Sequence, residues 1–273
     1  MIDLFWLILA GFGGGILAGI LGIGGGIIYV LVLPYALSHA GIPQDQLAQF
    51  TIANSIFGIL FASLVTSLLN IHHRDFHLKE SLYVGLPGAA VSIVTLRWIV
   101  VKPWFTVTYF YVFLIFFLLI MLLSLFLKQN RDHEKHRPES TIKLGLSGAT
   151  GGALSALTGL GGGAVVVPLL TTQLDMGIKK ARSISLVMIL ITSLSLTILN
   201  LLIHPGQPAL PYQTGYIYFP AAIPLTAGVL IGSPLGSRLG RFFSEDTVKI
   251  LFGILILIVI MEKLYQLWSI LGY

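Results

Sequence analysis

Two glycine-rich segments have the residue types and spacing that could bind an anion. Both place glycines at the first, third, fourth and fifth positions of a five-residue stretch. A helix that restarts after such a segment presents free backbone N–H groups and the positive end of its dipole to an anion. Glycine allows positive φ and close approach of a ligand because it has no β-carbon. We therefore predict an anion site built from Gly22, Gly24, Gly25, Gly26, Gly159, Gly161, Gly162 and Gly163.

Small polar side chains near these segments extend the predicted site. Thr158 directly precedes the second glycine segment, and the apolar stretch after each segment carries hydroxyl or amide groups. Ser and Thr in membrane helices commonly bond to carbonyls of their own helix. An amide in lipid needs partners, which makes Asn54 the strongest candidate among them. The side chains predicted to contribute are Thr51, Asn54, Ser55, Thr158, Ser183 and Ser185.

The composition places this site in a membrane. Hydrophobic residues make up 56% of the chain, charged residues only 10%, and the mean hydropathy is +0.92. Soluble domains carry about 25% charged residues, and several apolar runs here reach the ~20 residues that cross a bilayer. The sequence thus predicts an all-α polytopic protein of the cell (inner) membrane. We assign its net charge of +5 to loops that fix orientation, with no nucleic-acid partner, and leave a homodimer possible.

The two glycine segments belong to an internal repeat. Their glycines correspond at a constant offset of 137 residues, and "GFGGGILAG" from Gly11 is echoed by "GATGGALSA" from Gly148. A polar stretch, "KQNRDHEKHRPESTIK", separates the halves. We predict a first membrane repeat over residues 1–127, a cytoplasmic linker over 128–143 and a second repeat over 144–273. The chain has no cysteine, which excludes thiolate metal sites, and we expect neither a cofactor nor a metal.

The length of the glycine-containing segments indicates that each one folds back. Residues 4–37 would form a helix of about 51 Å, too long for a core of about 30 Å. A break at the glycines gives two half-helices that meet near the midplane. Each repeat then has a broken, re-entrant helix pair plus three transmembrane helices, and the two repeats have inverted topology.

The distribution of basic residues favours this threading. With eight straight spans, the 16 Lys and Arg residues divide evenly between the faces, against the usual cytoplasmic excess. With two re-entrant pairs, one face keeps only Arg97, Lys102 and Lys263. The other face then collects Arg74, Lys79, Lys128, Arg131, Lys135, Arg137, Lys143, Lys179, Lys180, Arg182, Arg238, Arg241 and Lys249.

The duplicated glycine segments, the Pro168 that follows one of them and "GSPLGSRLG" from Gly232 resemble the TauE/SafE family of sulfite exporters. The resemblance covers nearly the whole chain. The first half departs from it, with Leu31 at the place of Pro168 and only "GLPGAA" from Gly85 as a counterpart of the later motif. The resemblance implies an anion permease or exporter of alternating-access type for sulfite or a related organosulfur oxyanion. It does not identify the anion.

Two other classes of function compete with a permease. A membrane scaffold without transport would use its glycines only for close helix packing, which we expect in any case for Gly11, Gly15, Gly19, Gly148 and Gly152. An intramembrane enzyme is disfavoured because the chain has no GxSxG or HExxH motif and no paired intramembrane aspartates. The run "HHRDFH" from His72 suggests a solvated loop rather than a metal site.

Overall fold

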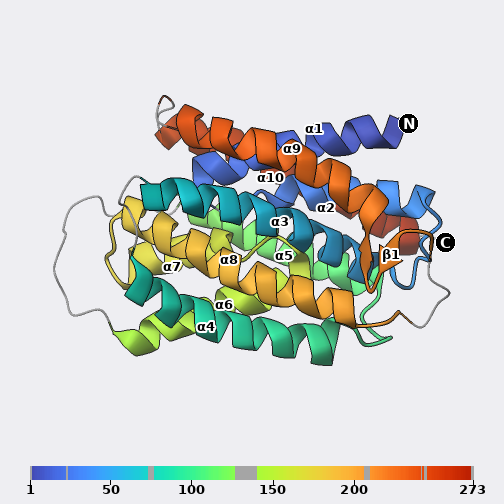
Figure 1. Ribbon diagram of the computed structural model, residues 1–273, viewed down its shortest axis with the longest axis horizontal. Coiled ribbons are helices and arrows are strands. Elements are labelled where there is room, and N and C mark those ends of the chain that lie inside the picture. Colours follow the sequence, from blue (N-terminus) through green and yellow to red (C-terminus); the bar gives the residue numbers. More distant parts are fainter. Residues whose placement is uncertain are drawn as a thin grey trace.

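The computed structural model describes residues 2–22, 24–72, 77–126, 140–205, 210–240, 242 and 245–271, and it is a helical bundle (Figure 1). Its first half contains α1 (Ile2–Leu21), α2 (Gly26–His39), α3 (Leu47–His72), α4 (Leu78–Thr95), the π-helical turn η1 (Leu96–Val100) and α5 (Val107–Phe126). Its second half contains α6 (Thr141–Thr158), α7 (Gly163–Gln173), α8 (Ile178–Leu202), β1 (Gln213–Thr214), β2 (Ile217–Tyr218), α9 (Phe219–Leu239) and α10 (Glu245–Leu271).

The all-α membrane class is confirmed. In the described parts of the chain, seven helices are long and apolar enough to cross a membrane: α1, α3, α4, α5, α8, α9 and α10. Helices α2 and α7 are shorter, with 14 and 11 residues. Only these second arms have half-helix length, because α1 runs for 20 residues and α6 for 18. The sequence also gave no sign of the short β1–β2 hairpin, in which Gln213 pairs with Tyr218.

Each glycine segment reverses the direction of the chain. Figure 1 shows α2 running back toward the end of the bundle where α1 begins, and α7 running back toward the opposite end, where α6 begins. Both arms of each pair are in contact: a β-carbon on Gly25 would meet the Gly14 carbonyl, and one on Gly162 would meet the Gly151 carbonyl. These two contacts are related by the offset of 137 residues.

The glycines assigned to packing lie against backbone, as predicted. Helix α1 lies along α9, where Gly11 faces the Leu225 carbonyl and Gly15 lies against Val229 and Ser233. Helix α6 lies along α4 in the same way, with Gly148 and Gly152 facing the carbonyls of residues 84 and 88. Backbones approach this closely only where no β-carbon intervenes.

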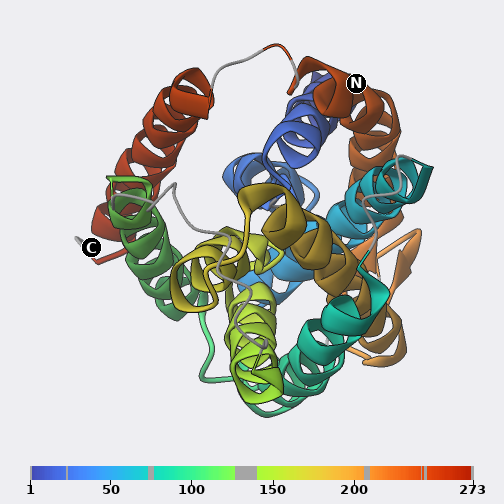
Figure 2. The ribbon, with the colours of Figure 1, turned by 90° about the vertical axis from the view of Figure 1, so that its left-hand side faces the viewer.

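The centre and edge of the bundle differ in how firmly they are packed. Helices α3 and α8 contact each other at the centre, and 61% of each of their spans is buried. Viewed from the end, α5 and α10 lie side by side at one edge (Figure 2). Helix α10 packs mainly along α5 and also touches α2. The α5–α10 pair is therefore the peripheral part of the structure.

The predicted domain limits stay predictions. Helix α5 ends at Phe126, and α6 begins at Thr141, three residues before the predicted start of the second repeat. Most of the predicted linker, residues 128–139, lies outside the described residues. So do residues 73–76 of the histidine-containing run.

We expect residues 72–80, the linker, 175–183 and 238–249 to share the cytoplasmic face. In Figure 1, β1 lies at the end of the bundle that holds both termini, and the connection of α7 to α8 lies at the other end. Because the chain has no cysteine, single cysteines report topology directly. Ser140→Cys and Gly177→Cys should resist an impermeant thiol reagent added outside cells, whereas Thr214→Cys should react. Labelling of only one of the first two would support eight straight spans.

Candidate anion site

The two glycine turns have nearly the same backbone conformation. The φ angles of Gly22, Gly24 and Gly25 are +71°, +90° and +70°, and those of Gly159, Gly161 and Gly162 are +68°, +92° and +69°. L-residues with side chains rarely adopt such angles. The predicted need for positive φ is confirmed at these six positions. Gly26 and Gly163 are instead the first residues of α2 and α7.

The turns contact each other in the interior of the protein. A β-carbon on Gly26 would lie 2.7 Å from the Gly159 carbonyl oxygen, and one on Gly24 would lie 3.6 Å from the Leu160 carbonyl oxygen. Gly24, Gly25, Gly26 and the second turn are all buried. The start of α2 therefore abuts the second turn, which brings the two predicted glycine clusters together.

Some backbone N–H groups of these turns have partners and others do not. In the second turn, Gly159 and Gly163 donate to the carbonyls of Ser155 and Gly161, at 2.9 and 2.8 Å. In the first turn, Gly22 donates to Ala18 at 2.9 Å. Within the described chain, no acceptor is found for the N–H groups of Gly24, Gly25, Gly161 and Gly162. Buried N–H groups without partners are costly, so such a cluster suits a ligand that accepts hydrogen bonds.

Ser55 and Ser185 occupy matching positions on the central helices α3 and α8. Gly159 lies against Ile52 and Ser55, and Gly24 lies against Ile59. On α8 the same spacing recurs, because Gly22 lies against Arg182 and Gly24 against Ile189. Residues three and four apart share a helix face, so Ser185 faces the first turn as Ser55 faces the second.

The two serines differ in their hydrogen bonds. The Ser55 hydroxyl donates to the Gly159 carbonyl at 2.6 Å. The Ser185 hydroxyl is completely buried, yet it has no partner among the described residues. Ser185 is therefore a side chain of the site that can donate to a ligand without losing an existing bond.

The other predicted hydroxyls fall into different settings. Thr51 is fully buried on α3, one turn before Ser55, and its hydroxyl lacks a partner in the described structure. Thr158 donates to the Leu154 carbonyl at 2.7 Å and accepts from the Leu160 N–H at 3.3 Å, which braces the second turn. Ser183 is buried on α8 and has an interaction partner.

Asn54 is held by the β1–β2 hairpin. Its Nδ2 donates to the carbonyls of Phe50 and Tyr216, at 2.7 and 3.2 Å, and its Oδ1 accepts from the Tyr218 N–H at 3.1 Å. Both amide hydrogens are thus used within the protein. The hairpin is further fixed by ring contact between Phe50 and Tyr216. Burial, together with the charge of Asp45, raises the pKa of Tyr216, so its hydroxyl stays neutral near pH 7.

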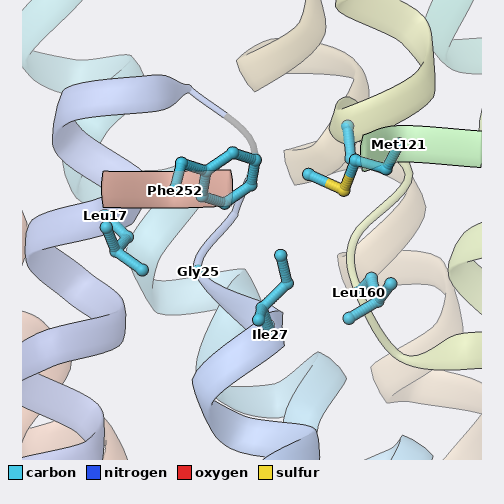
Figure 3. A pocket seen from close by; sticks show the side chains of 8 residues that line it. Leu17, Gly25, Ile27, Met121, Leu160 and Phe252 are labelled. Carbon is cyan, nitrogen blue, oxygen red and sulfur yellow. The ribbon is translucent and has the colours of Figure 1, made fainter. Parts of the chain in front are cut away.

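A small cavity borders the first glycine turn (Figure 3). It is lined by Leu17, Gly25, Gly26, Ile27, Met121, Leu160, Ala164 and Phe252. Its enclosed space is about 10 Å³ within a recess of about 240 Å³, and about 10–15 Å³ is needed for one water molecule. Met121 of α5 and Phe252 of α10 form one side of the cavity, so in this conformation the peripheral helix pair closes it to anything as large as an oxyanion.

Three charged residues have positions that the sequence did not indicate. Arg182 was counted with loop residues, but its side chain lies against Gly22. Glu262 and Lys263 were placed near the end of a span and on the outer face, and this is wrong. Both lie inside the apolar span Ile250–Ile270, and Lys263 is fully buried. No group of potential metal ligands is found among the described residues.

Comparison with known proteins agrees with the architecture. Residues 7–262 match the family model described as "Sulfite exporter TauE/SafE", so the chain belongs to the TauE/SafE family. It is a multi-pass integral membrane protein of a transporter family.

Its relatives carry transporter names. The chain is 27% identical to a "Probable membrane transporter protein" of Methanocaldococcus jannaschii, over 90% of either chain. It is 25% identical to one of Haemophilus influenzae, over 92% of this chain and 94% of that one. It is 23% identical to YunE of Bacillus subtilis, over 95% and 97%. No solved structure matches the chain significantly.

We expect Gly162→Ala to destabilise the protein strongly. Its β-carbon would meet the Gly151 carbonyl, and its φ of +69° disfavours a residue with a side chain, at a cost of about 1–3 kcal/mol for the backbone alone. Gly177→Ala is the matched control, because a β-carbon there meets nothing within 4 Å. Thermal unfolding in detergent should show a lower Tm for the first variant and an unchanged Tm for the second. Equal Tm values would contradict the role given to the turn.

Proposed function

We propose that this protein is a permease for a small oxyanion and that it binds the anion between the two glycine turns. Sulfite or a related organosulfur oxyanion is the leading substrate, on the strength of the family description, and the cell (inner) membrane is the proposed location. The observation that carries the proposal is the group of buried donors without acceptors: the N–H groups of both turns and the Ser185 hydroxyl.

The electrostatics of the turns suit a small anion. Helices α2 and α7 both begin at a glycine turn, and each helix N-terminus carries about half a positive charge. Two such ends compensate about one negative charge in a medium where an uncompensated charge is expensive. The donors are directional, which favours oxygen acceptors over halides. Arg182, whose side chain lies against Gly22, adds a full positive charge beside the first turn.

Transport in this proposal requires a change of conformation. The cavity beside Gly25 is too small for an oxyanion while Met121 and Phe252 border it. Substrate access therefore needs the α5–α10 pair to separate from the turns. A helix pair at the edge of the bundle can move in this way without disturbing the close backbone contacts of α1 with α9 and α4 with α6.

Direct flux measurement tests the function. Purified protein in proteoliposomes should move radiolabelled sulfite faster than protein-free liposomes, and unlabelled competitors such as sulfate, thiosulfate, sulfonates and small carboxylates should rank the substrates. Absence of flux for every anion would support the alternative, a membrane scaffold whose glycines serve helix packing.

Ser185→Ala tests the site itself. Removing a hydroxyl that has no partner leaves the fold intact but takes one donor from the ligand, so we expect about a tenfold weaker anion affinity and an unchanged Tm. Ser55→Ala is the matched comparison and should lower Tm, because it removes the bond to the Gly159 carbonyl. Calorimetry and thermal unfolding measure the two effects. Unchanged affinity in Ser185→Ala would exclude this serine from the site.

A further inference from the structure

Lys263 is a fully buried lysine inside a membrane-spanning helix. Its Nζ lies 2.9 Å from Glu262 Oε2 and donates to Gln266 Oε1 at 3.1 Å. It also lies over the rings of Tyr111 and Tyr35, 5.0 and 5.9 Å from their centroids. Charged groups inside a membrane are costly and generally mark functional positions. The glycine site does not use this one.

Glu262 connects the lysine to another part of the protein. Its second oxygen, Oε1, accepts a hydrogen bond of 2.6 Å from the hydroxyl of Tyr35 on α2. Its side chain is 18% exposed, so a proton can reach the carboxylate from solution. Glu262, Lys263 and Tyr35, which we call the α10 cluster, thus join α10 to the second arm of the first glycine turn, and Tyr111 joins it to α5.

The α10 cluster holds the helix that closes the cavity. Phe252 lies ten residues before Glu262 on α10, about 15 Å along the helix, and it borders the cavity beside Gly25 and Gly26 (Figure 3). Helix α10 otherwise packs mainly along α5. The contact with α2 therefore fixes the position of the α5–α10 pair relative to the turns.

We propose that Glu262 is a proton-binding site that controls opening of the α5–α10 pair. One proton from solution adds to the carboxylate, and Lys263 keeps its own proton. The neutral acid no longer compensates the buried ammonium group, and the bond from Tyr35 loses its charge-assisted character. Lys263 then gains by moving toward water, which separates α10 from α2 and uncovers the glycine turns. Loss of the proton restores the closed arrangement. That the uncovered space receives an anion rests on the proposed function.

Few other groups around Glu262 change charge in mild acid. The described groups that face it are Tyr35 on α2, Tyr111 on α5, and Lys263, Tyr265 and Gln266 on α10. One turn beyond Tyr35 lies His39, whose ring Nδ1 is 2.8 Å from the Tyr35 carbonyl oxygen. His39 is the group that a test must separate from Glu262.

Spin labels on α2 and α10 measure the opening without substrate. Because the chain has no native cysteine, Ser38→Cys and the exposed Trp268→Cys can be labelled as a pair in nanodiscs. Pulsed electron resonance should show one short distance at about pH 8 and a several-fold increase of a longer distance at about pH 5. Glu262→Gln should show the longer distance at both pH values, and His39→Gln should respond as the parent does.

A second variant guards against misfolding of Glu262→Gln. The double change Glu262→Gln with Lys263→Met removes both charges, so its distance should not depend on pH. An unchanged distance in the parent, or the same pH response in either Glu262 variant, would overturn the proposal. These distances are recorded without anion, so this outcome is independent of the flux measurement that tests the proposed function.

Discussion

The structure depends on one constraint: a backbone that leaves the helical conformation inside a membrane must find its hydrogen-bond partners within the protein. Two irregular turns meet this constraint by facing each other. Gly24 and Gly26 lie against the carbonyls of Leu160 and Gly159, while Ser55 and Thr158 brace the second turn from the side. Neither turn has a substitute for the other, since lipid offers no donors or acceptors. The remaining N–H groups, which these contacts leave without acceptors, define where a ligand is most useful.

Close helix packing makes room for this arrangement. Helix α1 reaches the backbone of α9 through Gly11 and Gly15, and α6 reaches α4 through Gly148 and Gly152. Each contact puts a carbonyl where a β-carbon would stand, so these four helices form a rigid frame around α3 and α8. The α5–α10 pair has no such contacts among its described residues. The division between a rigid frame and a mobile pair is thus set by where glycine occurs.

Much of this arrangement could be predicted from the sequence. Repeated glycines at fixed spacing predicted both turns, their positive φ angles and the packing glycines, because only glycine satisfies these backbone conditions. Polar side chains were harder to place, since their partners come from distant segments. Asn54 bonds to a hairpin 162 residues away, which no local pattern indicates. Ser55 and Ser185 match at an offset of 130 residues rather than 137, so the repeat defined by the glycines did not pair them.

The two halves share a frame but differ in their polar groups, and this difference gives the protein a direction. Ser55 is bonded to the second turn, whereas the matching Ser185 is unpaired beside the first. Aligning Ile120 and Met121 of α5 with Ile260 and Met261 of α10 places two leucines opposite Glu262 and Lys263. A buried ion pair adds little net stability compared with such apolar residues. Its presence in one half alone is therefore better explained by a conformational role than by a structural one, because a symmetric frame with two identical contacts would have no preferred side from which to open.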